Sequence, residues 1–223
     1  MNPRMTYLNF HTHRLSHTQN ETPVINLSTA CPIDSDFKEW YTTGIHPWSA
    51  ADITDIEKAL HEIRQQASVP QCVAIGEIGL DYCKPVPKNI QKQIFASQIQ
   101  LAEQLNLPII IHCVKAWNDL LDIHKRLSVN VPCIVHGFRG KPELTSQLIK
   151  KNFYLSFGVR HNPESLKICP VNRLFLETDE DEYPIAALYQ TAAVLHALST
   201  EEMKAQCWRN FQAIKTGKPE KGI

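Results

Sequence analysis

The chain lacks several features that would mark particular classes of protein. No apolar run approaches the length of a membrane span, and the opening MNPRMTYLNF has neither the long apolar region nor the cleavage site of a secretory signal. Its 23 basic and 23 acidic residues balance, so it lacks the basic surface of a protein that grips long duplexes by their phosphates. We therefore expect a cytoplasmic protein with no membrane partner, in which any nucleic acid is held locally.

The cysteines exclude a further kind of site. The seven cysteines form no Cys-x-x-Cys pair, which argues against a structural zinc site built on thiolates. Their odd number suits reduced thiols in a cytosolic protein. No composition break, repeat, low-complexity tract or linker divides the sequence. The 223 residues, of which 43% are hydrophobic, therefore predict a single domain over residues 1–223.

Short β-rich runs alternate with longer segments, several of which have helical periodicity. The eight expected strands lie at residues 6–10, 23–28, 40–45, 71–76, 108–112, 132–136, 153–157 and 173–178. The expected helices lie at residues 52–67, 88–106, 184–199 and 199–215. The alternation predicts an α/β fold with a parallel sheet, and eight strands fit a (β/α)8 TIM barrel. Segments 14–22 and 29–39 are so short that the first two βα units are expected to be reduced.

Side chains able to bind a metal stand where five of the expected strands end. They are His11, His13, Glu77, His112, His136 and Asp179. His11 and His13 point the same way because alternate residues of a strand share a face. The ends of barrel strands meet at the face where active sites lie, so we expect the six to converge. Mixed nitrogen and oxygen donors suit Zn²⁺, Mn²⁺, Co²⁺ or Fe²⁺ better than Ca²⁺.

Several segments resemble the signature blocks of the TatD family of metal-dependent hydrolases, in order and at plausible spacing. They are NFHTH, TTGIHPW, VAIGEIGLDY, PIIIHCVKAW, CIVHGFRG, YLSFG and LFLETDEDEYP, which span residues 9–184. Asn210 and Phe211 resemble the family's C-terminal Asn-Phe. The resemblance implies a TIM-barrel hydrolase, usually described as a deoxyribonuclease, that holds one or two divalent metal ions. Zn²⁺ is the expected ion, with Mg²⁺ or Mn²⁺ as alternatives.

The resemblance also implies a role for each of the six side chains. His11, His13 and Asp179 would serve one metal, and His112 and His136 the other. Glu77 would lie between the two. Two close cations lower the pKa of a bridging water and stabilise charge on the attacking and leaving oxygens, so water is the expected nucleophile. Asp179 and Glu77 are the expected catalytic carboxylates, and Asp179 is placed to orient the water or accept its proton.

Cationic and polar side chains are expected in the loops at the same face of the barrel, where we expect them to contact the substrate. Lys115, Arg139 and Arg160 each follow a strand end by three residues, where they could bind phosphate. His46, in GIHPW, is expected to contact the substrate or its leaving group. Aromatic residues in neighbouring loops could stack on a base. They are Trp48, Tyr82 and Trp117.

Three hypotheses for the function stay open. The first is hydrolysis of phosphodiester bonds at short or single-stranded DNA ends. The second is a metal-dependent amide or ester hydrolase, including deacylation of aminoacyl-tRNA, because an activated water also attacks carbonyl groups. The acidic run 180–182, where relatives often carry a basic segment, keeps this second hypothesis open. The third is a metal-binding barrel without catalysis. The sequence makes no prediction of the oligomeric state.

Overall fold

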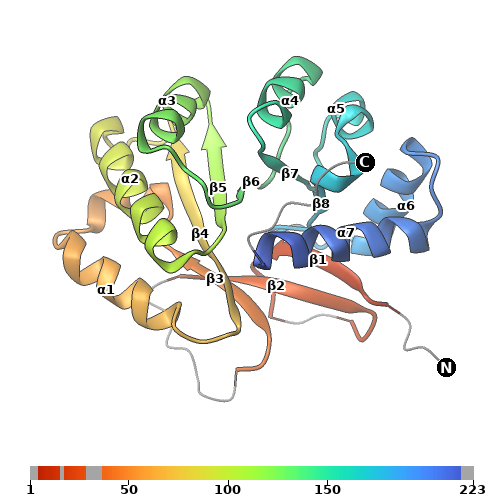
Figure 1. Ribbon diagram of the computed structural model, residues 1–223, viewed down its shortest axis with the longest axis horizontal. Coiled ribbons are helices and arrows are strands. Elements are labelled where there is room, and N and C mark those ends of the chain that lie inside the picture. Colours follow the sequence, from red (N-terminus) through yellow and green to blue (C-terminus); the bar gives the residue numbers. More distant parts are fainter. Residues whose placement is uncertain (1–4, 16–17, 29–36, 217–223) are drawn as a thin grey trace. The chain divides into compact units, whose positions relative to one another are not determined.

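The computed structural model describes residues 5–15, 18–28 and 37–216. Within these residues, eight strands form one sheet in the order β1 to β8 expected of a (β/α)8 barrel, and Figure 1 labels them. The strands are β1 (Tyr7–Thr12), β2 (Glu21–Ser28), β3 (Trp40–Gly44), β4 (Cys72–Asp81), β5 (Ile109–Val114), β6 (Cys133–Val135), β7 (Tyr154–Phe157) and β8 (Leu174–Leu176). The α-helices are α1 (Ile56–Gln66), α2 (Lys88–Leu105), α3 (Trp117–Leu127), α4 (Pro142–Ile149), α5 (Pro163–Ile168), α6 (Ile185–Leu195) and α7 (Thr200–Lys215), and the 3-10 helices are η1 (Pro47–Asp52) and η2 (Val171–Arg173).

The chain divides into two compact units. Unit 1 comprises residues 1–25 and 134–223, and unit 2 comprises residues 26–133. The first boundary falls inside β2 and the second at the start of β6. The expectation of a single domain over residues 1–223 stays a prediction.

Several expected elements, among them the fourth strand and the first helix, differ in extent from those observed. The fourth strand was expected to end at residue 76, but β4 continues to Asp81, so Glu77 lies inside a strand. The first helix was expected over residues 52–67, but α1 begins at Ile56 because the Asp55 carboxylate accepts the Lys58 N–H and caps it. Residues 47–52 form η1 instead, with Pro47 in its first turn.

The first βα unit contains no helix among its described residues, as expected for a reduced unit. Between β1 and β2, the described residues 13–15 and 18–20 contain no helix. Segment 29–36, on which the second reduced unit falls, lies outside the described residues, and so does Cys31. No helix in the described part of the chain has both the length and the hydrophobicity needed to cross a bilayer.

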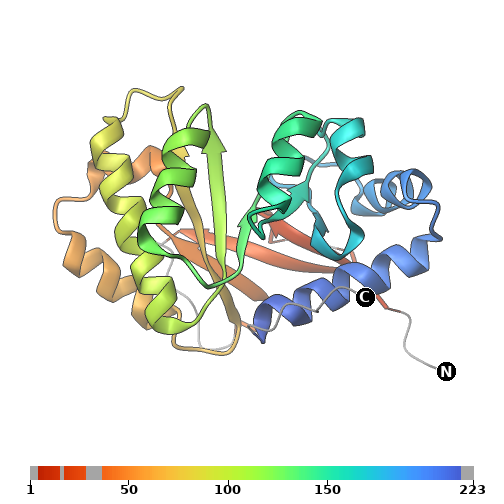
Figure 2. The same cartoon turned by 45° about the horizontal axis from the view of Figure 1, so that its top comes forward.

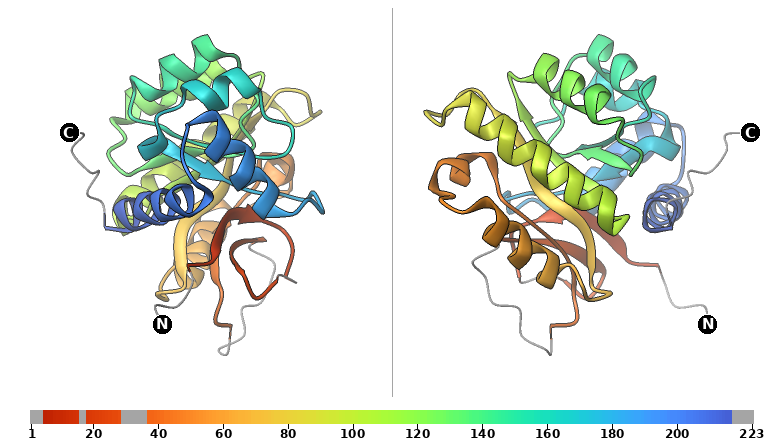
Figure 3. Two further views of the ribbon diagram at one scale, coloured as in Figure 1. Left: turned by 90° about the vertical axis from the view of Figure 1, so that its right-hand side faces the viewer. Right: turned by 60° about the vertical axis from the view of Figure 1, so that its left-hand side comes forward.

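In unit 1, α6 and α7 pack against β1 and β8. The rings of Phe10 on β1 and Phe175 on β8 stack with centroids 3.8 Å apart, and Phe211 of α7 meets Phe10 edge-on at 6.2 Å. Ser199 and Glu202 exchange hydrogen bonds in a capping box at the start of α7. Asn210 donates to the carbonyls of Val171 and Leu174 at 2.8 Å each, so α7 holds the start of β8. Figure 3 shows α7 as the dark blue helix.

In unit 2, strands β3, β4 and β5 pair in parallel and α2 packs against β4. Figure 2 shows α2 and α3 side by side in this unit. Two buried glutamines of α2, seven residues apart, hold the strand ends. Gln98 accepts from the Ile45 N–H at 2.7 Å and donates to the Ile45 carbonyl at 3.1 Å. Gln91 does the same for Asp81, at 2.7 and 2.9 Å. These amides fix the backbone beside the functional side chains.

We predict that Gln98→Leu lowers the free energy of unfolding by about 3 kcal/mol, because it leaves the buried amide and carbonyl of Ile45 without partners. Urea denaturation followed by circular dichroism measures this change. Gln100→Leu is the matched control, since Gln100 is exposed on the same helix, and it should change stability by less than about 0.5 kcal/mol. Equal effects of the two substitutions would contradict the assigned role of Gln98.

Candidate metal centre and active site

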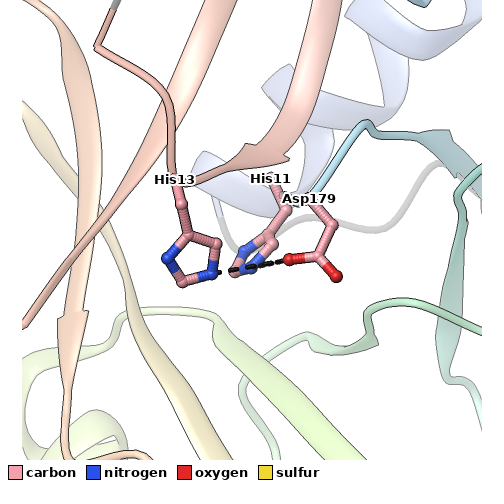
Figure 4. A group of neighbouring side chains, drawn as sticks. All are labelled: His11, His13 and Asp179. Carbon is pink, nitrogen blue, oxygen red and sulfur yellow. Dashed lines mark ion pairs between the residues drawn. The ribbon is translucent and has the colours of Figure 1, made fainter. Parts of the chain in front are cut away.

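Unit 1 brings three predicted ligands together in one cluster. Figure 4 shows His11, His13 and Asp179 with their polar atoms converging. Each offers one ligand atom, and the three atoms all lie within 4.8 Å of one another. Asp179 Oδ1 lies 3.8 Å from His11 Nε2 and 3.5 Å from His13 Nε2. His11 is buried, whereas His13 and Asp179 are about a third exposed, so the cluster is open on one side.

Backbone pairing between β1 and the segment after β8 sets this geometry. The Asp179 N–H donates to the His11 carbonyl at 3.0 Å, and the His13 N–H donates to the Asp179 carbonyl at 3.2 Å. These two bonds fix Asp179, which follows β8, to the end of β1. The residue has a left-handed φ of 55°. The Asn9 side chain supports the junction, because it accepts from the Thr178 N–H at 2.9 Å and donates to the Thr178 hydroxyl at 2.8 Å.

His136 joins this cluster from the end of β6. Its ring centroid lies 4.3 Å from that of His11. The fully buried carboxylate of Glu177 lies behind it, with Oε1 at 3.4 Å from His136 Nδ1 and 2.5 Å from the donating Gly137 N–H. Burial alone would raise the pKa of Glu177, but the hydrogen bond and charge of His136 and the charge of His11 hold it below its usual value.

Unit 2 holds a second cluster of metal-capable side chains. The ligand atoms of His46, Glu77 and His112 all lie within 4.8 Å of one another. Glu77 Oε1 lies 2.7 Å from His112 Nδ1 and 3.2 Å from His46 Nε2. Asn26 holds the glutamate in place, since it accepts from the Glu77 N–H at 3.0 Å and donates to Oε2 at 3.3 Å. His46, which we expected at the substrate, thus lies directly beside Glu77.

Asp81 supports His112 from the opposite side of the imidazole. Asp81 Oδ2 lies 3.3 Å from His112 Nε2 and accepts the Trp48 indole N–H at 2.7 Å, while Oδ1 accepts the Cys83 N–H at 2.8 Å. Burial alone would raise the pKa of Asp81, but these hydrogen bonds lower it. A carboxylate on one nitrogen of a histidine fixes the ring and leaves the other nitrogen for a metal.

The donor sets of both clusters fit a divalent metal ion. Two imidazoles and a carboxylate are borderline ligands of the kind that Zn²⁺ and its neighbours accept. Ligand atoms about 2.1 Å from a tetrahedral ion stand roughly 3.4 Å apart. The separations of 3.5 and 3.8 Å in unit 1 are close to that spacing and too long for hydrogen bonds. That all six predicted side chains together hold the metal stays a prediction.

The predicted substrate contacts fall in two places. Arg139 and Arg160 of unit 1 line a small pocket together with Asp179 and Asp181. Arg160 Nη2 lies 3.5 Å from Asp181 Oδ1, so part of the acidic run is paired with a cation. Lys115 follows β5 in unit 2, exposed and with a left-handed φ of 53°. The contacts of these three side chains to a substrate stay predictions.

Two residues that support the histidines were not expected from the sequence. Asp81 closes GEIGLD and Glu177 lies in LETD, each within two residues of one that we had singled out. The sequence did contain a signal for them, namely an acidic residue at the end of an apolar strand. Such a residue needs a partner when it is buried. Periodicity alone could not show that this partner was a histidine of a different strand.

Comparison with known proteins shows the family. Residues 17–215 match the model of the family described as TatD related DNase. The metal-dependent hydrolase YabD of Bacillus subtilis, named as uncharacterized, is 42% identical over 145 residues, which cover 61% of this chain and 56% of YabD. The 3'-5' ssDNA/RNA exonuclease TatD of Musicola paradisiaca is 30% identical over 203 residues, which cover 80% of this chain and 72% of that protein.

Solved structures show the same fold. A TatD family hydrolase from Entamoeba histolytica superposes with a TM-score of 0.76 at 17% identity, covering 94% of this chain and 98% of that one. The TatD homologue YJJV of Escherichia coli gives a TM-score of 0.75 at 19% identity and covers 86% of this chain and 85% of its own. The chain belongs to the TatD related family of metal-dependent hydrolases, and the expected (β/α)8 barrel class is confirmed.

We predict that Glu177→Gln weakens metal binding by about 10- to 100-fold, because the buried partner that orients His136 loses its charge. Calorimetric titration of the metal-free protein with Zn²⁺ and Mn²⁺ measures the affinity directly. Glu164→Gln, an exposed carboxylate of unit 1, is the matched control and should bind as the wild type does. Unchanged affinity in Glu177→Gln would show that this carboxylate does not support a metal ligand.

Proposed function

We propose that this chain is a divalent-metal-dependent nuclease that cleaves phosphodiester bonds at single-stranded DNA ends. The observation that carries the proposal is the placement of two arginines beside the His11, His13 and Asp179 cluster. Arg139 and Arg160 line the same small pocket as Asp179. Metal-ligand side chains next to guanidinium groups suit a phosphate, because guanidinium binds phosphate oxygens with charge-assisted hydrogen bonds. The name of the Musicola relative points to the same substrate class.

The residues of the chain divide the chemistry between them. A bound divalent ion would activate water at neutral pH and offset charge on the phosphate. His11, His13 and Asp179 would hold one ion, and Glu77, His112 and His136 would complete the ligand set predicted from the sequence. Asp179, being partly exposed, is placed to accept the proton of the attacking water.

Arg139 and Arg160 would bind the phosphate, and Lys115 would add a further cation. His46, whose Nε2 lies 3.2 Å from Glu77, would contact the leaving group or hold the glutamate. Such local cations can grip a short end on a chain whose formal net charge is zero. We expect this nuclease to act in the cytoplasm.

We predict that the purified protein cleaves an end-labelled single-stranded oligonucleotide when Mg²⁺, Mn²⁺ or Zn²⁺ is present, and that EDTA abolishes the cleavage. Asp179→Asn should lower the rate by about 10²- to 10⁴-fold, because it removes both a ligand and the proton acceptor. Asp122→Asn, on the exposed face of α3, is the matched control and should cleave normally. Gel electrophoresis of timed samples gives the rate and the polarity of cleavage.

The outcome also separates the proposal from its alternatives. Absence of cleavage in protein shown by calorimetry to contain metal would refute the nuclease. Hydrolysis of a carboxylic ester or of aminoacyl-tRNA by the same preparation would then identify an amide or ester hydrolase. Metal binding without turnover of any of these substrates would identify a barrel that holds metal without catalysis.

A further inference from the structure

Trp48 is unusual among the aromatic residues of unit 2 because it is both exposed and firmly held. Of the four tryptophans, all within the described residues, it alone counts among the exposed large hydrophobic side chains, with 48% of its surface accessible. Its indole N–H donates to Asp81 Oδ2 at 2.7 Å. The His46 ring packs against it edge-on with centroids 4.7 Å apart. The ring is thus fixed in one orientation while much of it faces solvent.

A lysine from the loop between β4 and α2 lies over this ring. Lys84 Nζ is 3.9 Å from the centroid of the Trp48 ring, within the range of a cation–π contact. The arrangement recurs four residues later, where Lys88 Nζ lies 4.5 Å from the centroid of Tyr82. Pro85 and Pro87 restrict the backbone between the two lysines. The loop therefore presents paired aromatic rings and cations on a stiff segment.

One carboxylate links this surface to the metal-capable cluster of unit 2. Asp81 Oδ2, which accepts the Trp48 N–H, also lies 3.3 Å from His112 Nε2. The centroids of Trp48 and His112 are 6.1 Å apart. A ligand stacked on Trp48 would consequently lie within about one nucleotide of His112 and Glu77. Exposed apolar rings fixed next to polar clusters are typical of ligand sites rather than of packing.

We propose that Trp48 is a stacking platform for one nucleobase of the single strand, and that Lys84 binds the adjoining phosphate. This inference rests on the proposed nuclease function. Stacking needs an unpaired base, since a base within a duplex has no free face, so the platform selects single strands over duplexes. Lys84 would leave the ring when a base stacks, and its ammonium would then pair with a phosphate. No base is distinguished, because every base has a π-face.

Binding to metal-free protein tests the platform without cleavage. Fluorescence anisotropy would compare a labelled 12-nucleotide thymidine oligomer with an abasic oligomer of equal charge. Trp48→Leu should weaken binding of the thymidine oligomer roughly 10-fold or more and leave the abasic oligomer unchanged. Trp48→Phe, which keeps a ring, should stay within about threefold of the wild type. Lys84→Ala should weaken both oligomers, whereas Lys92→Ala, a lysine that lies 3.6 Å from Asp119, should weaken neither.

Each outcome separates this inference from the function on which it rests. Equal binding of the thymidine oligomer by wild type and Trp48→Leu would overturn the platform while leaving the nuclease intact. Failure of the wild-type protein both to bind and to cleave single strands would overturn the nuclease itself and the platform with it. Circular dichroism and metal titration of both Trp48→Leu and Trp48→Phe should match the wild type, which would show that the fold and His112 are undisturbed.

Discussion

The hydrogen bonds that join β1 to the chain beyond β8 are the constraint on which the candidate centre of unit 1 depends. His11 and Asp179 are far apart in sequence, yet the backbone of Asp179 bonds to His11 on one side and to His13 on the other. Peptide groups therefore place the backbone that carries the candidate ligand atoms. Because little of this geometry has to be ordered when an ion arrives, the entropic cost of binding falls on few side chains.

Buried amides perform the corresponding task in unit 2. Asn26, Gln91 and Gln98 are not themselves candidates for catalysis, but they hydrogen-bond to the backbone of Glu77, of Asp81 and of Ile45, the residue before His46. An amide side chain both donates and accepts, so it can satisfy the N–H and the carbonyl of one residue where strand pairing stops. Hydrophobic residues of the same size would pack equally well and leave those groups without partners. Gln91 and Gln98 of α2 therefore have to be polar, because they bond to the backbone groups at the strand ends.

The sequence predicted what depends on local pattern and missed what depends on distant partners. The β-rich runs predicted all eight strands to within a few residues, and the helix expected over residues 199–215 is α7. The expected fourth strand ended at residue 76 because Glu77 interrupts an apolar run, and its contacts with Asn26, His46 and His112 are what make its burial tolerable. Helix α5 went unrecognised although Asn162 caps it and Pro163 follows. The supporting roles of Asp81 and Glu177 needed coordinates, because their histidines lie on other strands.

Two cations near the clusters are each held by a neighbouring side chain, and this bears on the choice of substrate. Arg160 is paired with Asp181, and Lys84 rests on Trp48. The Asp181 carboxylate offsets the charge of Arg160, and a formal net charge of zero leaves little long-range positive field. A long duplex needs many simultaneous phosphate contacts, which this distribution does not offer. A strand end needs only a few phosphate contacts, made next to the reacting bond, so these electrostatics suit the proposed cleavage of short single-stranded ends better than cleavage of an extended duplex.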